Sequence, residues 1–187
     1  GEISESRLDD GCRRILTVKE NRGILDWKES DFSLNKALST VGSATNRATE
    51  REIAAAAVTV VKNENNTLPV VVKENQKILM LCPYDNERAQ MIMAYNRAKE
   101  AGLIPDSAEV KVVRYNGSNM NAVKENIDWA DTVFVNSEIS AASRFSSNHW
   151  LYSYVEGIVD YTHEKGKKSI VMSVDKPYDV QMYANAD

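Results

Sequence analysis

The sequence is poor in cysteine and contains no long apolar run, and both absences narrow its class. Cys12 and Cys82 are its two cysteines, and they fall in segments typical of an amphipathic helix and a buried strand. We therefore expect both thiols to pack as small hydrophobes and to form no disulfide. No apolar stretch approaches the roughly 20 residues of a membrane helix, and nothing at the start resembles a signal peptide, so no membrane partner is predicted. The compartment stays open between cytoplasm and secretion.

A strongly basic surface is also missing, as are the usual cofactor motifs. The formal net charge is −4 with both signs interspersed, which gives no electrostatic footprint for nucleic acid. The sequence has no Gly-rich phosphate loop, no Gly-x-Ser-x-Gly elbow and no Cys-x-x-Cys, so nucleotide, acyl-transfer and zinc chemistry lose their usual anchors. His149 and His163 share one predicted helix but lie about 21 Å apart on it, too far to bind one metal. Surface or helix-capping roles are favoured for both, and no metal or cofactor is predicted.

Alternating strand-like and helix-like segments fill the chain after residue 76. The predicted strands are Lys77–Cys82, Glu109–Tyr115, Thr132–Asn136 and Ser169–Val174. The predicted helices are Asn86–Ala101, Asn119–Ile127, Asn148–Glu164 and Tyr178–Asn185. Short apolar strands joined through helices are typical of a mostly parallel sheet covered on both faces. The sequence therefore predicts the α/β class, as a three-layer α/β/α sandwich.

The first 63 residues read as two helices joined by a polar segment. Apolar residues recur at helical spacing in Ser4–Arg22, and Gly23 ends that helix. Apolar residues in the polar segment, Phe32, Leu34 and Leu38, predict that it packs against something. In the second predicted helix, Asn46–Asn63, the crowded residues Val58, Val60 and Val61 are expected to be buried under the sheet.

Several separated motifs, in order, resemble one known enzyme domain. The stretch Ala57–Pro69 carries the pattern A-V-T-x-x-K-N-x-x-x-x-L-P, and Lys77–Pro83 carries K-I-L-x-x-x-P. Val41–Ser43 resembles a V-G-S that opens the domain, and Lys176–Asp179 resembles an N-P-Y-D after a buried strand. Together these residues resemble the C-terminal α/β domain of glycoside hydrolase family 3, in its β-N-acetylhexosaminidase branch.

This resemblance implies a domain organisation. Residues 1–26 are similar to the final helix of the family's (β/α)8 barrel, which carries R-I-L-x-x-K-x-x-x-G, and residues 27–44 are similar to the interdomain linker. Residues 45–187 then form the C-terminal sandwich. The family continues beyond the point matched by Asp187 with further strands, so we expect the sheet to lack its last strands. The implied partner is the barrel, and an exposed sheet edge makes self-association a further expectation.

The resemblance transfers no catalytic residue to this chain. In the family the nucleophilic Asp lies on the barrel, and in the hexosaminidase branch a His-Asp pair on a barrel loop serves as acid/base. The loop after the Thr132–Asn136 strand holds polar residues where α/β sheets place ligands: Asn136, Ser137, Glu138, Ser140, Ser143 and Arg144. The β-glucosidase branch supplies its acid/base Glu from about this place, which makes Glu138 a candidate, and Arg144 is a candidate to face the sugar. The loop lacks that branch's E-x-x-D-R pattern, and a solvated loop is the plain alternative.

Two other groups of residues have plainer interpretations. The turn Pro83–Asn86 is interpreted as a helix N-cap. Trp27, Trp129 and Trp150 suit sugar stacking, although core packing is favoured for all three.

Three functions follow from these observations. The first is an accessory domain of a retaining glycosidase that acts on N-acetylglucosamine-containing glycans, with the glycan at the domain interface. The second is a free-standing carbohydrate-binding module. The third, a nucleotide or signalling domain, is disfavoured because the phosphate loop is missing.

Overall fold

The computed structural model describes residues 3–64, 66–141, 144, 146 and 148–187. It divides into two compact units, Gly1–Thr59 and Val60–Asp187. The sequence analysis starts the sandwich domain at residue 45, within the helix Ala44–Ala57, and the second unit starts at Val60. Each unit is described by itself.

The N-terminal unit consists of helices separated by short turns. These are α1 (Glu5–Asn21), the short 3-10 helix η1 (Glu29–Asp31), α2 (Leu34–Thr40) and α3 (Ala44–Ala57). Serine hydroxyls cap the three α-helices by accepting a backbone N–H from the first turn: Ser4 from Arg7, Ser33 from Lys36 and Ser43 from Asn46. Gly23 adopts a φ of +65° just after α1, in the left-handed conformation that favours glycine.

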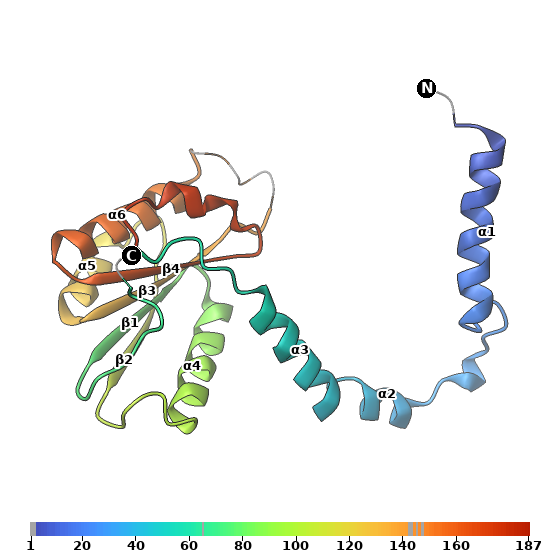
Figure 1. Cartoon of the computed structure of the whole chain (residues 1–187), viewed down its shortest axis with the longest axis horizontal. Coiled ribbons are helices and arrows are strands. Elements are labelled where there is room, and N and C mark those ends of the chain that lie inside the picture. The colour runs from blue at the N-terminus through green and yellow to red at the C-terminus, as the bar shows by residue number, and fades with distance from the viewer. Residues whose placement is uncertain (1–2, 65, 142–143, 145, 147) are drawn as a thin grey trace. The chain divides into compact units, whose positions relative to one another are not determined.

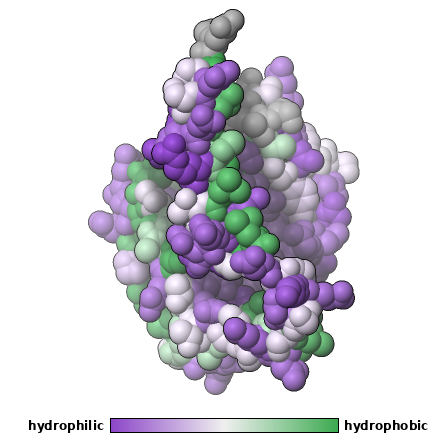
Figure 2. Space-filling model, turned by 90° about the vertical axis from the view of Figure 1, so that its right-hand side faces the viewer, coloured by the Kyte–Doolittle hydropathy of each residue, from purple (hydrophilic) through white to green (hydrophobic). Residues whose placement is uncertain are grey.

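No described residue of α1, α2 or α3 is buried. The stripe of α1 that contains Leu8, Ile15 and Leu16 is more than half exposed, and Figure 2 shows green atoms among purple ones along the part of the surface that faces the viewer. The expected packing of Phe32, Leu34 and Leu38 is wrong for this chain, since each is at least 60% exposed. Trp27 and Cys12 are exposed as well, so their predicted core roles are also wrong. The helices of this unit form no hydrophobic core among the described residues, so their apolar side chains stay exposed.

The second helix ends six residues earlier than predicted, and its valines are not buried. α3 stops at Ala57, and Val58, Val60 and Val61 are between 58% and 74% exposed. The reason is local: the alanine run 54–57 gives the last turn high helix propensity, whereas the β-branched residues from Val58 to Val61 lose side-chain freedom in a helix. The predicted burial of these valines under the sheet is therefore wrong.

The segment after Thr59 is extended and is fixed by one asparagine. The side chain of Asn63 donates to the Leu68 carbonyl and accepts from the Leu68 N–H, both at 2.9 Å. Lys62 Nζ donates to the carbonyl of Ala184 at 2.6 Å. These contacts give the Lys-Asn and Leu-Pro parts of the motif a structural role, since they hold the segment that leads into the sheet.

A four-stranded parallel sheet forms the centre of the second unit. Its strands are β1 (Lys77–Cys82), β2 (Glu109–Arg114), β3 (Thr132–Glu138) and β4 (Lys168–Val174), in the order β2-β1-β3-β4. Helix α4 (Asp85–Glu100) covers one face, and α5 (Met120–Trp129) and α6 (Trp150–Glu164) cover the other (Figure 1). The predicted three-layer α/β/α sandwich is confirmed.

The core lies mainly between the sheet and the α5–α6 layer. Fully buried side chains from the two central strands meet others from both helices: Leu79, Leu81, Val133, Val135, Val123, Ile127, Val155 and Ile158. Cys82 is buried, as predicted. Trp129 and Trp150 are partly buried and pack against this cluster, in agreement with the core interpretation.

The last predicted helix is a shorter 3-10 helix. The sequence predicts Tyr178–Asn185, whereas the structure shows η3 at Pro177–Met182, with proline in its first turn. The chain then turns back to β4, where Asp187 N–H donates to the Ser169 carbonyl at 3.0 Å and Asp187 Oδ2 accepts from Ser169 N–H at 2.9 Å. Asp187 is therefore hydrogen-bonded to β4, the strand at one edge of the sheet, through Ser169.

Candidate functional site

The topology creates one natural binding position in the sheet. The chain passes from β1 outward to β2, then returns across β1 to β3 and β4. The loops that follow β1 and β3 therefore lead to helices on opposite faces of the sheet, α4 and α6. In open α/β sheets, ligands bind outside the carboxyl ends of the strands where the direction of winding reverses. Here that position lies between the ends of β1 and β3.

Glu138, the candidate from sequence, is the last residue of β3 and reaches this position half-buried. Its carboxyl group is one of the causes, after burial, of a raised pKa at Glu87. Sequence reasoning missed Glu87, which lies 51 positions away and is the third residue of α4. The candidate site is therefore built around a pair of carboxyl groups.

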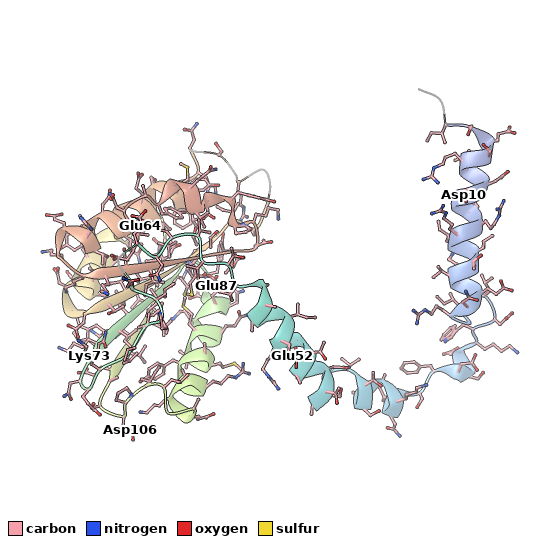
Figure 3. All side chains as sticks on the ribbon, in the orientation of Figure 1. Asp10, Glu52, Glu64, Lys73, Glu87 and Asp106 are labelled. Carbon is pink, nitrogen blue, oxygen red and sulfur yellow. The ribbon has the colours of Figure 1, made fainter. Side chains whose placement is uncertain are left out.

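Glu87 is held rigidly although it begins a surface helix. Its Oε2 accepts the Tyr84 N–H at 3.0 Å, the reciprocal half of a capping box, and its Oε1 accepts from the Asn136 side-chain amide. The side chain is only 5% exposed, and Figure 3 labels it at the start of α4. Burial, followed by the contact with Glu138, raises the pKa of Glu87 to about 7.

Arg144, the second candidate, lies on the same edge. Its Nη1 donates to the Tyr84 hydroxyl at 3.0 Å and to Ser140 Oγ at 2.7 Å. Burial, with the charge of Arg144 second, lowers the pKa of His149. Tyr84 thus connects Glu87 with Arg144, because its N–H donates to Glu87 and its hydroxyl accepts from Arg144. The loop residue Ser143 lies outside the described residues.

A buried polar cluster lies behind this edge and fastens η3 to the sheet. Asp179 is fully buried and accepts hydrogen bonds from three hydroxyl groups, those of Ser137, Ser173 and Tyr183, the last at 3.0 Å. Burial is also the first cause of the raised pKa of Tyr183. The motif residue Asp179 therefore links η3 to β3 through Ser137 and to β4 through Ser173, and we assign it a structural role.

The remaining sequence candidates have structural roles. His149 is the N-cap of α6, where its Nδ1 accepts the Leu151 N–H at 3.4 Å, and His163 is exposed in the last turn. The favoured interpretation of both histidines is confirmed. Tyr84 is the N-cap of α4, as the turn Pro83–Asn86 predicted. Within the described ranges, no group of three or more His, Cys, Asp or Glu residues has the geometry to hold a metal ion.

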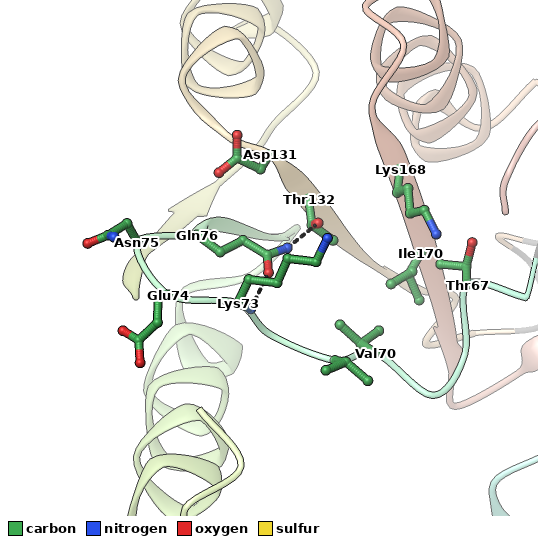
Figure 4. Close-up of a pocket in the computed structure, with 11 residues that line it drawn as sticks. Thr67, Val70, Lys73, Glu74, Asn75, Gln76, Asp131, Thr132, Lys168 and Ile170 are labelled. Carbon is green, nitrogen blue, oxygen red and sulfur yellow. Dashed lines mark hydrogen bonds between the residues drawn. The ribbon is translucent and has the colours of Figure 1, made fainter. Parts of the chain in front are cut away.

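A separate cavity of about 360 Å³ lies at the other end of the strands. Gln76, Thr132 and Lys168, which stand at or next to the starts of β1, β3 and β4, help to line it. Figure 4 shows Lys73 and Lys168 extending toward its middle, whereas the Glu74 carboxylate points away. Glu87, Glu138 and Arg144 are not among its lining residues, so this cavity does not belong to the candidate site.

The geometry limits what the carboxyl pair can do. Retaining glycosidases hold their two carboxyl groups about 5–5.5 Å apart, with the sugar between them. Glu87 is only 5% exposed, and both of its carboxyl oxygens already accept hydrogen bonds, from Tyr84 and Asn136, so it is not placed to act on a sugar. The half-buried Glu138 carboxyl can bind a ligand's hydroxyl groups, and Arg144 and Tyr84 add a cation and an aromatic ring.

The fold and the site together define the class: a doubly wound α/β/α domain with a polar ligand edge at its switch point. No protein-family model matches the chain. Over 80 residues, 43% of the chain, it is 30% identical to a protein of Cellulomonas fimi described as a beta-N-acetylglucosaminidase/beta-glucosidase. The match spans 14% of that protein's length. This similarity supports a relationship to glycoside hydrolases.

No helix among the described residues has both the length and the apolar character needed to cross a membrane.

Proposed function

We propose that this chain is the accessory C-terminal domain of a family-3 glycoside hydrolase of the β-N-acetylhexosaminidase branch. In this role the domain contributes one wall of a glycan cleft and does not hydrolyse glycosidic bonds alone. The observation that carries the proposal is the switch-point edge, where Glu138 ends β3 and Arg144 donates hydrogen bonds to Tyr84 and Ser140. The neighbouring carboxyl group of Glu87 is buried and has both oxygens hydrogen-bonded, so it is a poor second catalytic group. The substrate class is N-acetylglucosamine-containing glycans, with peptidoglycan fragments among them.

The proposed partner is the (β/α)8 barrel of the same polypeptide, which would supply the nucleophile and the acid/base device. The exposed stripe of α1 supports this part of the proposal. Leu8, Ile15 and Leu16 form an apolar face without a covering layer within the part of the chain that the structure describes. A helix with one apolar stripe normally buries it against another element, and the barrel is the element that the resemblance implies.

Kinetics of a polypeptide that joins this chain to its barrel test the proposal. Glu138→Gln and Arg144→Gln should raise KM or lower kcat/KM about tenfold or more, because a hydrogen bond to a charged group contributes roughly 1.5–3 kcal/mol. Glu156→Gln, an exposed carboxyl on α6, is the matched control and should leave both constants unchanged. Unaltered kinetics in Glu138→Gln and Arg144→Gln would show that this edge does not line the glycan cleft.

A free-standing carbohydrate-binding module is the second candidate, and the Tyr84–Arg144 contact favours it. An aromatic ring held beside a guanidinium group offers stacking and hydrogen bonding to one sugar. Calorimetric titration of the chain with N-acetylglucosamine oligomers separates the two candidates. Saturable binding that Arg144→Gln abolishes supports the module, whereas a flat titration supports the accessory domain.

A further inference from the structure

The cavity at the amino-terminal ends of the strands is separate from the candidate edge and has no part in the proposed function. Its volume of about 360 Å³ lies within the range of small-molecule pockets, which is roughly 300–1,000 Å³. All of its lining residues belong to the second unit, and they come from the segment before β1 and from the starts of β3 and β4. The cavity is therefore large enough for a small organic molecule.

Two lysine side chains enter this cavity from different segments. Lys73 stands in the segment before β1, and Lys168 is the first residue of β4. Figure 4 shows both side chains extending toward the middle of the cavity. Within the described part of the chain, neither ammonium group has an ion-pair or hydrogen-bond partner. Both positive charges are therefore available to a ligand.

The acidic residues of the cavity wall do not occupy these lysines. Glu74 accepts a hydrogen bond from the Ser107 hydroxyl, and Asp131 accepts the Lys77 N–H at 2.8 Å. Figure 4 shows the carboxylates of Glu74 and Asp131 directed away from the middle of the cavity. Carboxylates that already accept donors on the outside leave the positive charge on the inside.

Hydrogen bonds fix the backbone of both lysines to one residue of β3. The side chain of Gln76 accepts the Lys73 N–H at 2.7 Å and donates to Thr132 Oγ1 at 2.9 Å, as the dashed lines of Figure 4 show. Lys168 is the partner of the same Thr132 in the parallel pairing of β3 with β4. The two lysines are therefore held in place before a ligand arrives, which lowers the entropic cost of binding.

The remaining walls offer apolar surface and an unused hydroxyl group. Val70, Val71 and Ile170 line the cavity with branched apolar side chains. Thr67 also lines it and is 4% exposed, and its Oγ1 is buried without a hydrogen-bond partner. Buried hydroxyl groups in native proteins are normally hydrogen-bonded, so an unpaired one at a cavity wall indicates that a further polar atom belongs beside it.

We propose that this cavity is a binding site for a small organic anion, a phosphate or carboxylate attached to an apolar group. The oxyanion lies between the Lys73 and Lys168 amines, since an ammonium group binds either oxyanion through charge-assisted hydrogen bonds. The apolar group lies on Val70, Val71 and Ile170, where its burial from water favours an organic anion over an inorganic one. This site does not depend on the proposed function.

Amide NMR of the full chain, titrated with phenyl phosphate, tests the proposal. Binding should be saturable and should move the amide signals of Thr132, Lys168 and Ile170, whereas the signal of Glu138 at the candidate edge should stay in place. Inorganic phosphate lacks the apolar group and should bind more weakly, and phenol lacks the anion and should not bind. Benzoate in a parallel titration shows whether carboxylate or phosphate is preferred, and saturable binding of either at these residues supports the site.

Lysine variants test which charges bind the anion. Lys73→Gln and Lys168→Gln should each weaken phenyl phosphate binding about tenfold or more, because a charge-assisted hydrogen bond is lost. Lys99→Gln is the matched control, since Lys99 pairs with Asp106 at 3.2 Å and does not line the cavity. Its affinity should equal that of the wild type, and amide spectra confirm that each variant is folded.

Three results would overturn the proposal. The first is equal affinity for phenyl phosphate in the wild type and in both cavity variants. The second is phenol binding as tight as that of phenyl phosphate. The third is a set of non-saturating shifts spread over other lysines of the chain, which is the signature of non-specific attraction to positive surface charge.

Discussion

Removal of the Asp179 carboxylate is the most informative test of how the ligand edge is supported. The side chain is fully buried and accepts hydrogen bonds from Ser137, Ser173 and Tyr183. In Asp179→Ala the Ser173 hydroxyl loses its acceptor. The Ser137 and Tyr183 hydroxyls lie 2.9 Å apart and can still bond each other, which leaves one of their two donors unpaired. Each buried polar group left unpaired costs about 1–3 kcal/mol, so we expect a loss of at least about 2 kcal/mol in the free energy of unfolding.

Thermal unfolding by calorimetry measures this effect. For a unit of this size, 1 kcal/mol corresponds to roughly 3–5 °C, so Tm should fall by about 6 °C or more. Asp179→Asn keeps the shape and one acceptor oxygen and should fall between the wild type and Asp179→Ala. Asp106→Ala removes a carboxylate that is 97% exposed and is the matched control, with no expected change in Tm. Equal Tm values for Asp179→Ala and its control would refute the structural assignment.

Three further predictions follow from other parts of the chain. The free energy of unfolding of the wild type should decrease as pH rises from about 5 to about 7.5, because the pKa of Glu87 is raised in the folded state, which therefore binds a proton more tightly than the unfolded state does. The full loss is roughly 3 kcal/mol. Urea titrations at several pH values should show a weaker dependence of stability on pH in Glu87→Gln than in the wild type. Asn63→Ala should lower the free energy of unfolding by about 1–2 kcal/mol, since both of its hydrogen bonds to Leu68 disappear; an unchanged urea midpoint would count against the structural role of the motif. Val61→Asp should change stability by less than about 0.5 kcal/mol, because Val61 is exposed, whereas Val135→Asp at a fully buried position should cost more than about 4 kcal/mol; similar losses in both would contradict the described burial.

The sandwich was predictable because its signals are periodic and local. β1 matches its predicted bounds, Lys77–Cys82, since an apolar run of five residues follows Lys77 and ends at Pro83. The end of α3 was not predictable from the apolar pattern, because Val58 to Val61 continue that pattern while their β-branched side chains favour an extended backbone. Their exposure is a tertiary property, and apolar character alone did not distinguish a buried stretch from an exposed one.

The candidate site was predictable only in part. Glu138 and Arg144 follow a predicted strand, so their place at the carboxyl edge comes directly from the α/β pattern. Glu87 lies on another element, and its hydrogen bond with Asn136 of β3 depends on β1 and β3 being neighbours, which the order of strands along the chain does not reveal. A local signal was present: a glutamate three residues after the N-cap Tyr84 fits a capping box. That signal indicates a helix start and not a partner for a carboxyl group.

The central claim is that this chain supplies a glycan-binding wall and lacks hydrolytic activity of its own. The most direct measurement is hydrolysis of an aryl N-acetylglucosaminide by the purified chain, with rigorous removal of host enzymes. We expect no turnover above the uncatalysed rate, because Glu87, the carboxyl group beside this edge in the described part of the chain, is buried and has both oxygens hydrogen-bonded to Tyr84 and Asn136, whereas retaining hydrolysis needs two carboxyl groups free to act on the sugar. Turnover that disappears in Glu138→Gln and persists in Glu156→Gln would contradict the claim and make Glu138 a catalytic residue.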